Sequence, residues 1–166
     1  APVIAPHVPL SIIQRSTPNF SPGRFGFPPV GLVMHTMQGT LPGCDSWFAN
    51  PASQVSAHFG VSLRGDIHQY VKLENTAWAN GRLEMPCPWQ TVATSPNPNY
   101  ESISIETEDN GLPGVTPVSD AQYEAVIRLV VEVLLPLHPV LQYLVGHAAI
   151  SPKSRPFCPG FRWTDS

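Results

Sequence analysis

Three side chains that commonly bind transition metals lie in two distant parts of the chain. His147 and Cys158 belong to the proline-broken stretch GHAAISPKSRPFCPGFRW (146–163), and His35 lies near the end of the apolar run VGLVMHT (30–36). Two neutral imidazoles and one thiolate make a three-ligand zinc set, which leaves the fourth tetrahedral position to water, as in catalytic zinc sites. Because the spacing of His147 and Cys158 is not that of a zinc finger, the residue types favour zinc without deciding it.

The same residues permit two other interpretations. Cys158 could be a nucleophile with His147 as its base, which predicts inactivation by alkylating reagents and indifference to chelators. Each histidine could instead be a buried structural side chain, as a lone histidine in a strand commonly is. His35 and His147 differ from the other four histidines because they stand at the ends of apolar runs that lead into polar loops. Strand ends are where α/β proteins assemble their sites, so these two are the candidate ligands.

Hydrophobic periodicity indicates the strands that must position these residues. The apolar runs at 30–36 and 140–147 predict buried strands, and the alternating run YESISIETEDN predicts another over 100–110. VSAHFGVSL (55–63) and DIHQYVKL (66–73) flank a Gly-containing turn, which is typical of a β-hairpin. The Arg-Gly-Asp at this point is interpreted as the turn and not as an adhesion motif.

Two helices are expected between these strands. A short one covers 42–51, and a long one runs from Ser119 to Pro136, with Ser119 and Gln122 placed for a capping box. The long helix is predicted to present a core face at 126, 127, 130, 131, 134 and 135. The order of the elements predicts a single α/β domain with a central mixed β-sheet packed by α-helices, and with the site at one end of the sheet.

Composition narrows the function classes. The 166 residues are 42% hydrophobic and 13% charged, which indicates a folded chain, and twenty prolines indicate many ordered loops. Seven of these prolines lie in residues 1–29, which we expect to form an extended proline-rich arm before a domain over 30–166. The net charge of −3 gives no reason to expect nucleic acid as a partner, and no apolar run is long enough to insert in a membrane.

Four segments in this order resemble a known family: VMHTMQG, SAHFGVSLRGDIHQYV, SISIETED and GHAAISPKSRPFCPGF. Together they are similar to the zinc-dependent N-acetylmuramoyl-L-alanine amidases of the type-2 amidase and peptidoglycan recognition protein superfamily. The resemblance covers roughly residues 30–163. It implies a zinc ion (Zn2+) as cofactor, and hydrolysis of the bond between N-acetylmuramic acid and L-alanine in bacterial peptidoglycan. It also implies the catalytic domain of an endolysin or autolysin, which we expect to be a monomer acting outside the cell or at the cell wall.

The resemblance also implies roles for individual residues. The family's ligand positions fall on His35, His147 and Cys158, and its general base falls on Glu106. If Ile103 and Ile105 face the core, Glu106 faces the other side of the sheet, where Glu108 is its rival. A cation for the oxyanion usually stands two residues before the third ligand, but that position is Pro156 here. Arg155 is preferred over Lys153 for this role.

The segment ENTAWANGR belongs to the substrate groove that the resemblance implies. Trp78 and Asn80 are candidate substrate contacts, together with His58, whose family position is not a ligand. Where some relatives carry a catalytic tyrosine this chain has Ala57, which leaves more of the catalysis to Glu106.

Two questions stay open at the level of sequence. Cys44 and Cys87 are expected to border the groove, either as a disulfide or as two free buried thiols. Family members that have lost a zinc ligand bind peptidoglycan without hydrolysing it. The retention of all three candidate ligands here favours an enzyme over such a binding module.

Overall fold

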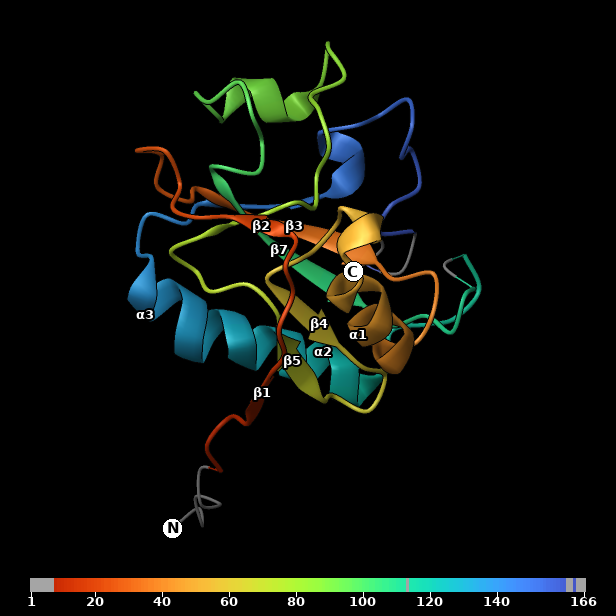
Figure 1. Ribbon diagram of the computed structural model, residues 1–166. Coiled ribbons are helices and arrows are strands. Elements are labelled where there is room, and N and C mark those ends of the chain that lie inside the picture. Colours follow the sequence, from red (N-terminus) through yellow and green to blue (C-terminus); the bar gives the residue numbers. More distant parts are fainter. Residues whose placement is uncertain (1–7, 113, 161–162, 164–166) are drawn as a thin grey trace, which may run out of the picture.

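The computed structural model describes residues 8–112, 114–160 and 163, and its centre is a six-stranded mixed sheet in the order β1-β5-β4-β7-β3-β8 (Figure 1). Strands β4, β7, β3 and β8 run parallel to one another, whereas β5 is antiparallel to β4. The predicted α/β fold with a central mixed sheet is confirmed.

The strands are β1 (Ile12–Gln14), β2 (Phe20–Ser21), β3 (Gly31–Thr36), β4 (Phe59–Val61), β5 (Ile67–Gln69), β6 (Thr76–Ala77), β7 (Ser102–Thr107) and β8 (Tyr143–Gly146). The helices are α1 (Leu41–Ala49), η1 (Pro51–Ser53), η2 (Pro88–Thr91), α2 (Asp120–Arg128), the π-helix η3 (Leu129–Leu134), α3 (Leu135–Leu137) and η4 (His147–Ala149).

At the two central strands, β3 and β7, one face of the sheet is apolar and the other is polar. They pair in parallel with His35 opposite Glu106, so both side chains lie on the same face of the sheet. Alternate residues point to the other face and join a buried cluster with α2 and η3. These residues are Leu32, Met34, Ile103 and Ile105. Glu106 therefore faces away from the main core, as the alternation of SISIET predicts.

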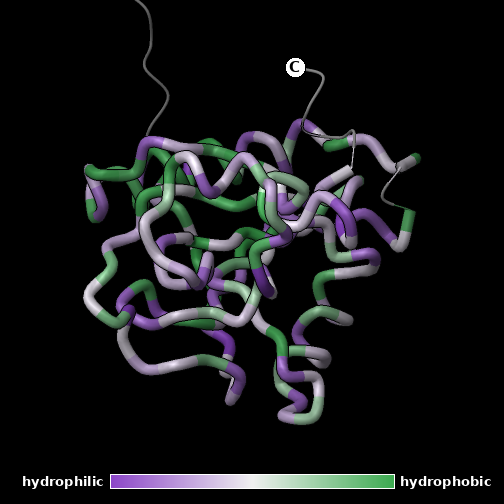
Figure 2. Tube along the Cα trace, turned by 90° about the horizontal axis from the view of Figure 1, so that it is seen from above, coloured by the Kyte–Doolittle hydropathy of each residue, from purple (hydrophilic) through white to green (hydrophobic). Residues whose placement is uncertain are grey.

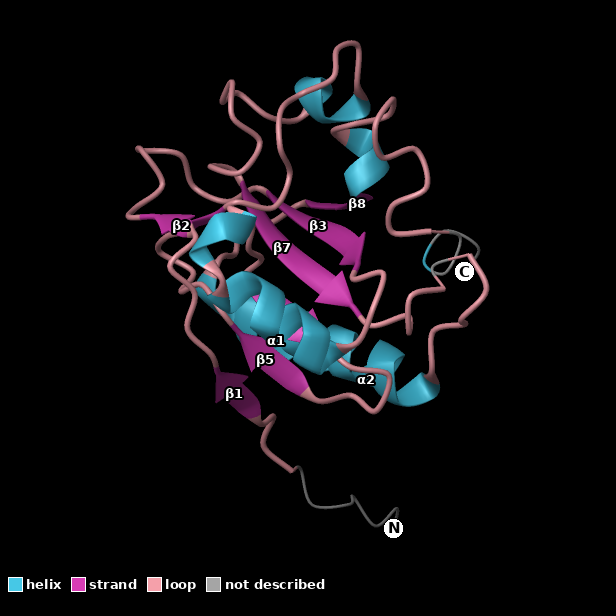
Figure 3. Ribbon diagram, turned by 45° about the vertical axis from the view of Figure 1, so that its right-hand side comes forward, coloured by secondary structure: helices cyan, strands magenta, loops and turns pink. Residues whose placement is uncertain are grey.

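Helices cover both faces of the sheet (Figure 3). α1 begins at the N-cap Thr40, whose hydroxyl accepts from Gly43 N, and it buries Cys44 and Phe48 in a second cluster on the polar face. α2 begins at Ser119, whose hydroxyl accepts from Gln122 N, and it packs on the opposite face. In Figure 2 several hydrophobic stretches run through the middle of the molecule, and others lie at its edge. Among the described residues, no helix combines the length and the apolar character that crossing a bilayer needs.

The long helix differs from the predicted one in its apolar face. Its middle, Leu129–Leu134, is a π-helix, so Leu129 and Leu134 are both fully buried although they are five residues apart. A π turn holds more residues than an α turn and rotates the next helical turns around the axis. Ile127 and Val131, which a continuous α-helix would direct to the core, are 44% and 57% exposed.

The predicted hairpin is confirmed, and a strand forms inside the predicted range 140–147, at Tyr143–Gly146, but its predicted burial is wrong. β4 and β5 pair with Phe59 opposite Gln69 and Val61 opposite Ile67. Among the described strands β8 is at the edge and pairs with β3 alone, and its Leu144 is 65% exposed. One neighbouring strand leaves part of an edge strand open to solvent.

The proline-rich segment contributes to the sheet and to its support. Residues 1–7 lie outside the described part of the chain, but Ile12–Gln14 form the edge strand β1, parallel to β5. Arg24 follows β2 and is only 9% exposed. Its guanidinium donates to the carbonyl oxygens of Leu73, Tyr100 and Ser102. This segment therefore holds the loop after β5 against the start of β7.

Candidate metal centre

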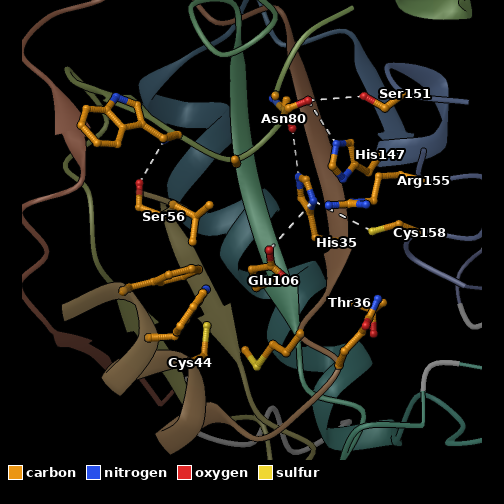
Figure 4. Close-up of a pocket in the computed structure, with 18 of the residues that line it drawn as sticks. His35, Thr36, Cys44, Ser56, Asn80, Glu106, His147, Ser151, Arg155 and Cys158 are labelled. Carbon is orange, nitrogen blue, oxygen red and sulfur yellow. Dashed lines mark hydrogen bonds and ion pairs between the residues drawn. The ribbon is translucent and has the colours of Figure 1, made fainter. Parts of the chain in front are cut away.

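His35, His147 and Cys158 come together at the carboxyl end of the parallel strands, in a cleft of about 750 Å3 (Figure 4). One nitrogen of each imidazole and the Cys158 sulfur all lie within 4.8 Å of one another, and the three side chains are buried. The imidazole rings are 4.4 Å apart between centroids. His35 and His147 are 111 residues apart in the intervening chain, and they come together because β3 and β8 are neighbours in the sheet.

A close backbone contact places Cys158 beside His147. Ala148 N donates to Cys158 O over 3.0 Å, which joins the last loop to the turn after β8. A Cβ atom on Gly146 would lie 2.5 Å from Cδ of Pro159 and 3.1 Å from Cys158 O. Only glycine therefore fits at this position, and its missing side chain lets the loop approach the strand end.

The outer nitrogens of both imidazoles contact Asn80. Nε2 of His35 lies 3.0 Å from Asn80 Oδ1, and Nε2 of His147 lies 3.1 Å from Asn80 O. Nδ1 of His35 lies 4.0 Å from Cys158 Sγ on the inner side. Asn80 is fully buried behind the rings. Asn80 also lines the cleft, so its expected contact with substrate stays a prediction.

The ionisation of the three side chains is set by burial. Burial, followed by the neighbouring His147, holds the pKa of His35 well below its ordinary value, and burial also lowers the pKa of His147. Both rings are neutral near neutral pH, which is the form that binds metals. Burial, and then Glu106, raise the pKa of the Cys158 thiol to about 12. A coordinated cation reverses this effect and removes the thiol proton.

Glu106 enters the cleft from β7, next to His35. Its Oε1 lies 3.9 Å from His35 Nδ1, and its Oε2 is buried without a hydrogen-bond partner among the described residues. Burial, and then Asp109, raise the pKa of Glu106 to about 8. A buried carboxylate oxygen without a partner is costly in a folded protein, so it marks a place for a water, an ion or a substrate group.

Glu108, the alternative candidate for the general base, has a structural role. Its two carboxylate oxygens accept from Leu41 N, at the start of α1, and from Leu63 N, in the hairpin turn. Glu108 does not line the cleft. It connects the helix to the hairpin, which leaves Glu106 as the carboxylate at the site.

The two candidate cations are separated by the structure. Arg155 lines the cleft, and its guanidinium extends toward His35 and Cys158 in Figure 4. Lys153 points elsewhere, with Nζ donating to Met85 O over 3.3 Å. Glu84 fixes the loop that carries both, because its carboxylate accepts from the backbone of Lys153 and Ser154.

Trp78 and His58, both predicted to contact substrate, lie in different environments. Trp78 lines the cleft, and its indole nitrogen donates to Ser21 Oγ over 2.9 Å. His58 does not line the cleft and is fully buried, with Ser104 N donating to its Nδ1. The prediction that His58 contacts substrate is wrong, because its ring lies inside the domain beside Arg24.

Cys44 and Cys87 are free buried thiols and do not form a disulfide. Cys44 lines the cleft from α1, whereas Cys87 packs against Trp89 in a separate cluster. The expectation that both border the groove is right for Cys44 alone.

The donor set fits zinc. One thiolate and two imidazoles are ligands that zinc prefers, and three protein ligands are typical of a catalytic site.

The sequence contains no signal for the residues that surround the candidate ligands. Nothing in the local pattern of ENTAWANGR indicates that Asn80 meets two histidines 45 and 67 residues away.

Fold and site together define a mixed-sheet α/β protein with a candidate two-histidine, one-cysteine metal centre in an open cleft. The family model described as N-acetylmuramoyl-L-alanine amidase matches residues 26–161 of this chain. The chain belongs to this family, as the four segments predict.

Individual relatives agree with this assignment. N-acetylmuramoyl-L-alanine amidase A from Achromobacter lyticus is 37% identical over 76 residues, which cover 45% of this chain and 34% of that protein. The chain therefore matches about a third of the length of this curated relative. A selenomethionine derivative of AmpD superposes with a TM-score of 0.72 at 24% identity, over 90% of this chain and 87% of the other. A mutant endolysin from Bacillus subtilis gives 0.62 at 23% identity, over 90% of each chain. These two structures share the fold.

Proposed function

We propose that this chain hydrolyses the amide bond between N-acetylmuramic acid and L-alanine in bacterial peptidoglycan, with a zinc ion as cofactor. The observation that carries the proposal is the convergence of His35, His147 and Cys158 within 4.8 Å in a cleft that also holds Glu106. Membership of the amidase family supplies the substrate and the bond. Relatives named as endolysins support a role in degrading the cell wall.

The three ligand side chains would hold the ion and leave one side of it open to the cleft. Zinc bound in this way polarises a carbonyl oxygen and makes water a nucleophile near neutral pH. The cleft volume of about 750 Å3 lies within the range of sites that enclose a small ligand. It can therefore accommodate the sugar and the first amino acid of the stem around the scissile bond.

Glu106 is proposed as the general base and acid. Amide hydrolysis adds water to the carbonyl carbon and breaks the C–N bond, and the departing amine must gain a proton. Oε2 of Glu106, which has no hydrogen-bond partner in the described part of the chain, can accept the proton of the attacking water and deliver it to that amine. A nearby cation lowers the pKa of a carboxylate, so metal binding would bring the pKa of Glu106 down from about 8 toward neutral pH.

Arg155 and Trp78 are proposed as substrate-facing residues. The Arg155 guanidinium extends toward the ligand cluster in Figure 4, where it can stabilise the charge that develops on the carbonyl oxygen. Trp78 lines the same cleft and is partly exposed, so its ring offers an apolar surface to the sugar. Lys153 is the less suitable cation because its Nζ donates to Met85 O, away from the cleft.

Two alternative functions make different demands on the site. A thiol hydrolase with Cys158 and His147 needs the imidazole within about 3 Å of the sulfur. The imidazole nitrogen in contact with Cys158 Sγ belongs instead to His35, at 4.0 Å, and Nε2 of His147 faces Asn80 O. A binding module that does not hydrolyse has no need of a buried carboxylate oxygen without a partner, such as that of Glu106.

The test is a product assay on the purified chain with and without zinc. Muropeptides carrying an intact stem are incubated with protein that has been stripped by a chelator, and with the same protein after zinc is restored. We expect the free amino group of L-alanine to appear only after restoration, with masses that match the sugar and the peptide. Alkylation of the zinc-loaded protein serves as a control, because a bound thiolate is shielded.

Full activity in protein shown to be metal-free would refute the zinc mechanism and favour the thiol hydrolase. Zinc binding at one ion per chain without cleavage would favour the binding module. We further propose that the chain acts as a monomer at the cell wall, where its polymeric substrate is located.

A further inference from the structure

The backbone and side chain of one residue, Asn80, contact both candidate histidine ligands. Asn80 Oδ1 lies 3.0 Å from Nε2 of His35, and Asn80 O lies 3.1 Å from Nε2 of His147. Both atoms are carbonyl oxygens, which accept hydrogen bonds and never donate them. Each Nε2 must therefore carry the proton of its neutral ring, which leaves both Nδ1 atoms with a free lone pair.

The free nitrogens are the ones that the metal needs. Nδ1 of His35 lies 4.0 Å from Cys158 Sγ and 3.9 Å from Glu106 Oε1, so it faces the centre of the cluster. A neutral imidazole in the other tautomer would place its proton at this centre. That proton would have to move before the ring could bind a cation.

The amide group of Asn80 is held in the required orientation. Its Nδ2 donates to Ser102 Oγ over 2.7 Å, and its backbone N–H donates to Asn99 Oδ1 over 2.8 Å. Asn80 is also fully buried. A rotated amide would direct the Nδ2 donor at His35 and would shift the proton of that ring to Nδ1, the ligand atom.

We propose that Asn80 is a positioning residue that fixes the tautomer of both ligand histidines and thereby sets the affinity for zinc. This inference rests on the proposed metal centre. It assigns the two histidines different supports, since His147 depends on the backbone carbonyl and only His35 depends on the side chain. A partner that fixes a metal-binding imidazole in this way typically accounts for 10- to 100-fold in metal affinity.

The difference between the two supports allows a test with an internal reference. Asn80→Ala removes the side-chain acceptor of His35 and keeps the backbone acceptor of His147. Asn80→Asp keeps an oxygen acceptor toward His35. Asn75→Ala is the matched control, because Asn75 Oδ1 accepts from Gly23 N over 2.9 Å and touches neither ligand.

Two measurements are made on the full chain without substrate. The zinc dissociation constant is obtained by competition with a chromophoric chelator. The protonation of each imidazole nitrogen is read from nitrogen-15 shifts before and after zinc is added. We expect Asn80→Ala to raise the dissociation constant by about 10- to 100-fold. We expect Asn75→Ala to leave it unchanged and Asn80→Asp to restore the wild-type value or improve on it.

The nitrogen shifts distinguish positioning from a general loss of structure. In zinc-free Asn80→Ala, His35 should show a mixture of tautomers, whereas His147 should keep its proton on Nε2. A wild-type dissociation constant in Asn80→Ala would overturn the proposal. So would a proton on Nδ1 of His35 in the zinc-free wild type, which needs no variant to fold. If zinc binds as expected but no amide is cleaved, the proposed function fails and this inference stands.

Discussion

The charge state of His58 gives a prediction about stability that does not depend on the metal. Ser104 N donates to Nδ1 of His58 over 3.1 Å, and Nε2 lies 3.1 Å from Asn75 O and 2.9 Å from Nη2 of Arg24. A second proton on this ring would meet the Ser104 N–H at Nδ1 and would add a positive charge beside the guanidinium. Burial, and then Arg24, lower the pKa of His58 from 6.5 to about 3, with a smaller contribution from His138 in the same direction.

The sign of the effect depends on the difference between the two pKa values. Below pH 6.5 the unfolded chain binds a proton at His58, and the folded chain does so only near pH 3. The stabilisation is therefore fully present above pH 6.5 and is lost as the pH falls toward 3. Because pH 5 lies 1.5 below the unfolded pKa, the loss between pH 7 and pH 5 is about 2 kcal/mol.

The assay is urea unfolding at pH 7 and at pH 5, followed by far-ultraviolet circular dichroism, with a chelator present in every sample. The comparison is with His58→Asn, whose amide oxygen can replace Nδ1 as the acceptor from Ser104 N. The wild type should lose about 2 kcal/mol more than the variant between the two pH values. His35 and His147 titrate in both proteins, so their contributions cancel. Equal losses in the two proteins would refute the assignment of a neutral buried His58.

Four substitutions test the site. Glu106→Gln should keep zinc affinity and reduce kcat by about 10²- to 10⁴-fold, because the proton carrier is lost; unimpaired turnover would contradict its role. Gly146→Ala should weaken zinc binding and destabilise the fold by about 1–3 kcal/mol. The reason is that its Cβ would lie 2.5 Å from Pro159 Cδ and would displace the loop with the third ligand, so wild-type zinc affinity would argue against this packing. Arg155→Ala should reduce kcat by about 10²-fold while Lys153→Ala leaves it unchanged, and equal effects would show that the cations are misassigned.

The strands and the face of Glu106 were predictable because they depend on local alternation. In SISIET, Ile103 and Ile105 alternate with polar residues, and a two-residue period leaves a strand one choice of core face. The run VGLVMHT that carries His35 is apolar without alternation, so its core face was not predictable in this way; in the structure Met34 points to the helix side and His35 to the face of Glu106.

The apolar face of the long helix was predicted less well for a physical reason. The sequence from 126 to 135 is apolar at most positions, so several helical phases bury a similar area. The π-helix at Leu129–Leu134 selects one phase, and its formation depends on packing against the sheet. Local periodicity contains no information about this choice.

The same lack of information about packing explains why the sequence only partly distinguished candidate ligand histidines from structural ones. His58 and His147 each direct Nε2 at the backbone carbonyl of an asparagine over 3.1 Å, Asn75 O for one and Asn80 O for the other. They differ at the second nitrogen. Nδ1 of His58 accepts from the backbone of β7, so no lone pair is left for a metal, whereas the ring of His147 borders the cleft. The candidate ligand His147 thus resembles the structural His58 in its backbone support but borders a cleft, and only the packing of distant strands decides this difference.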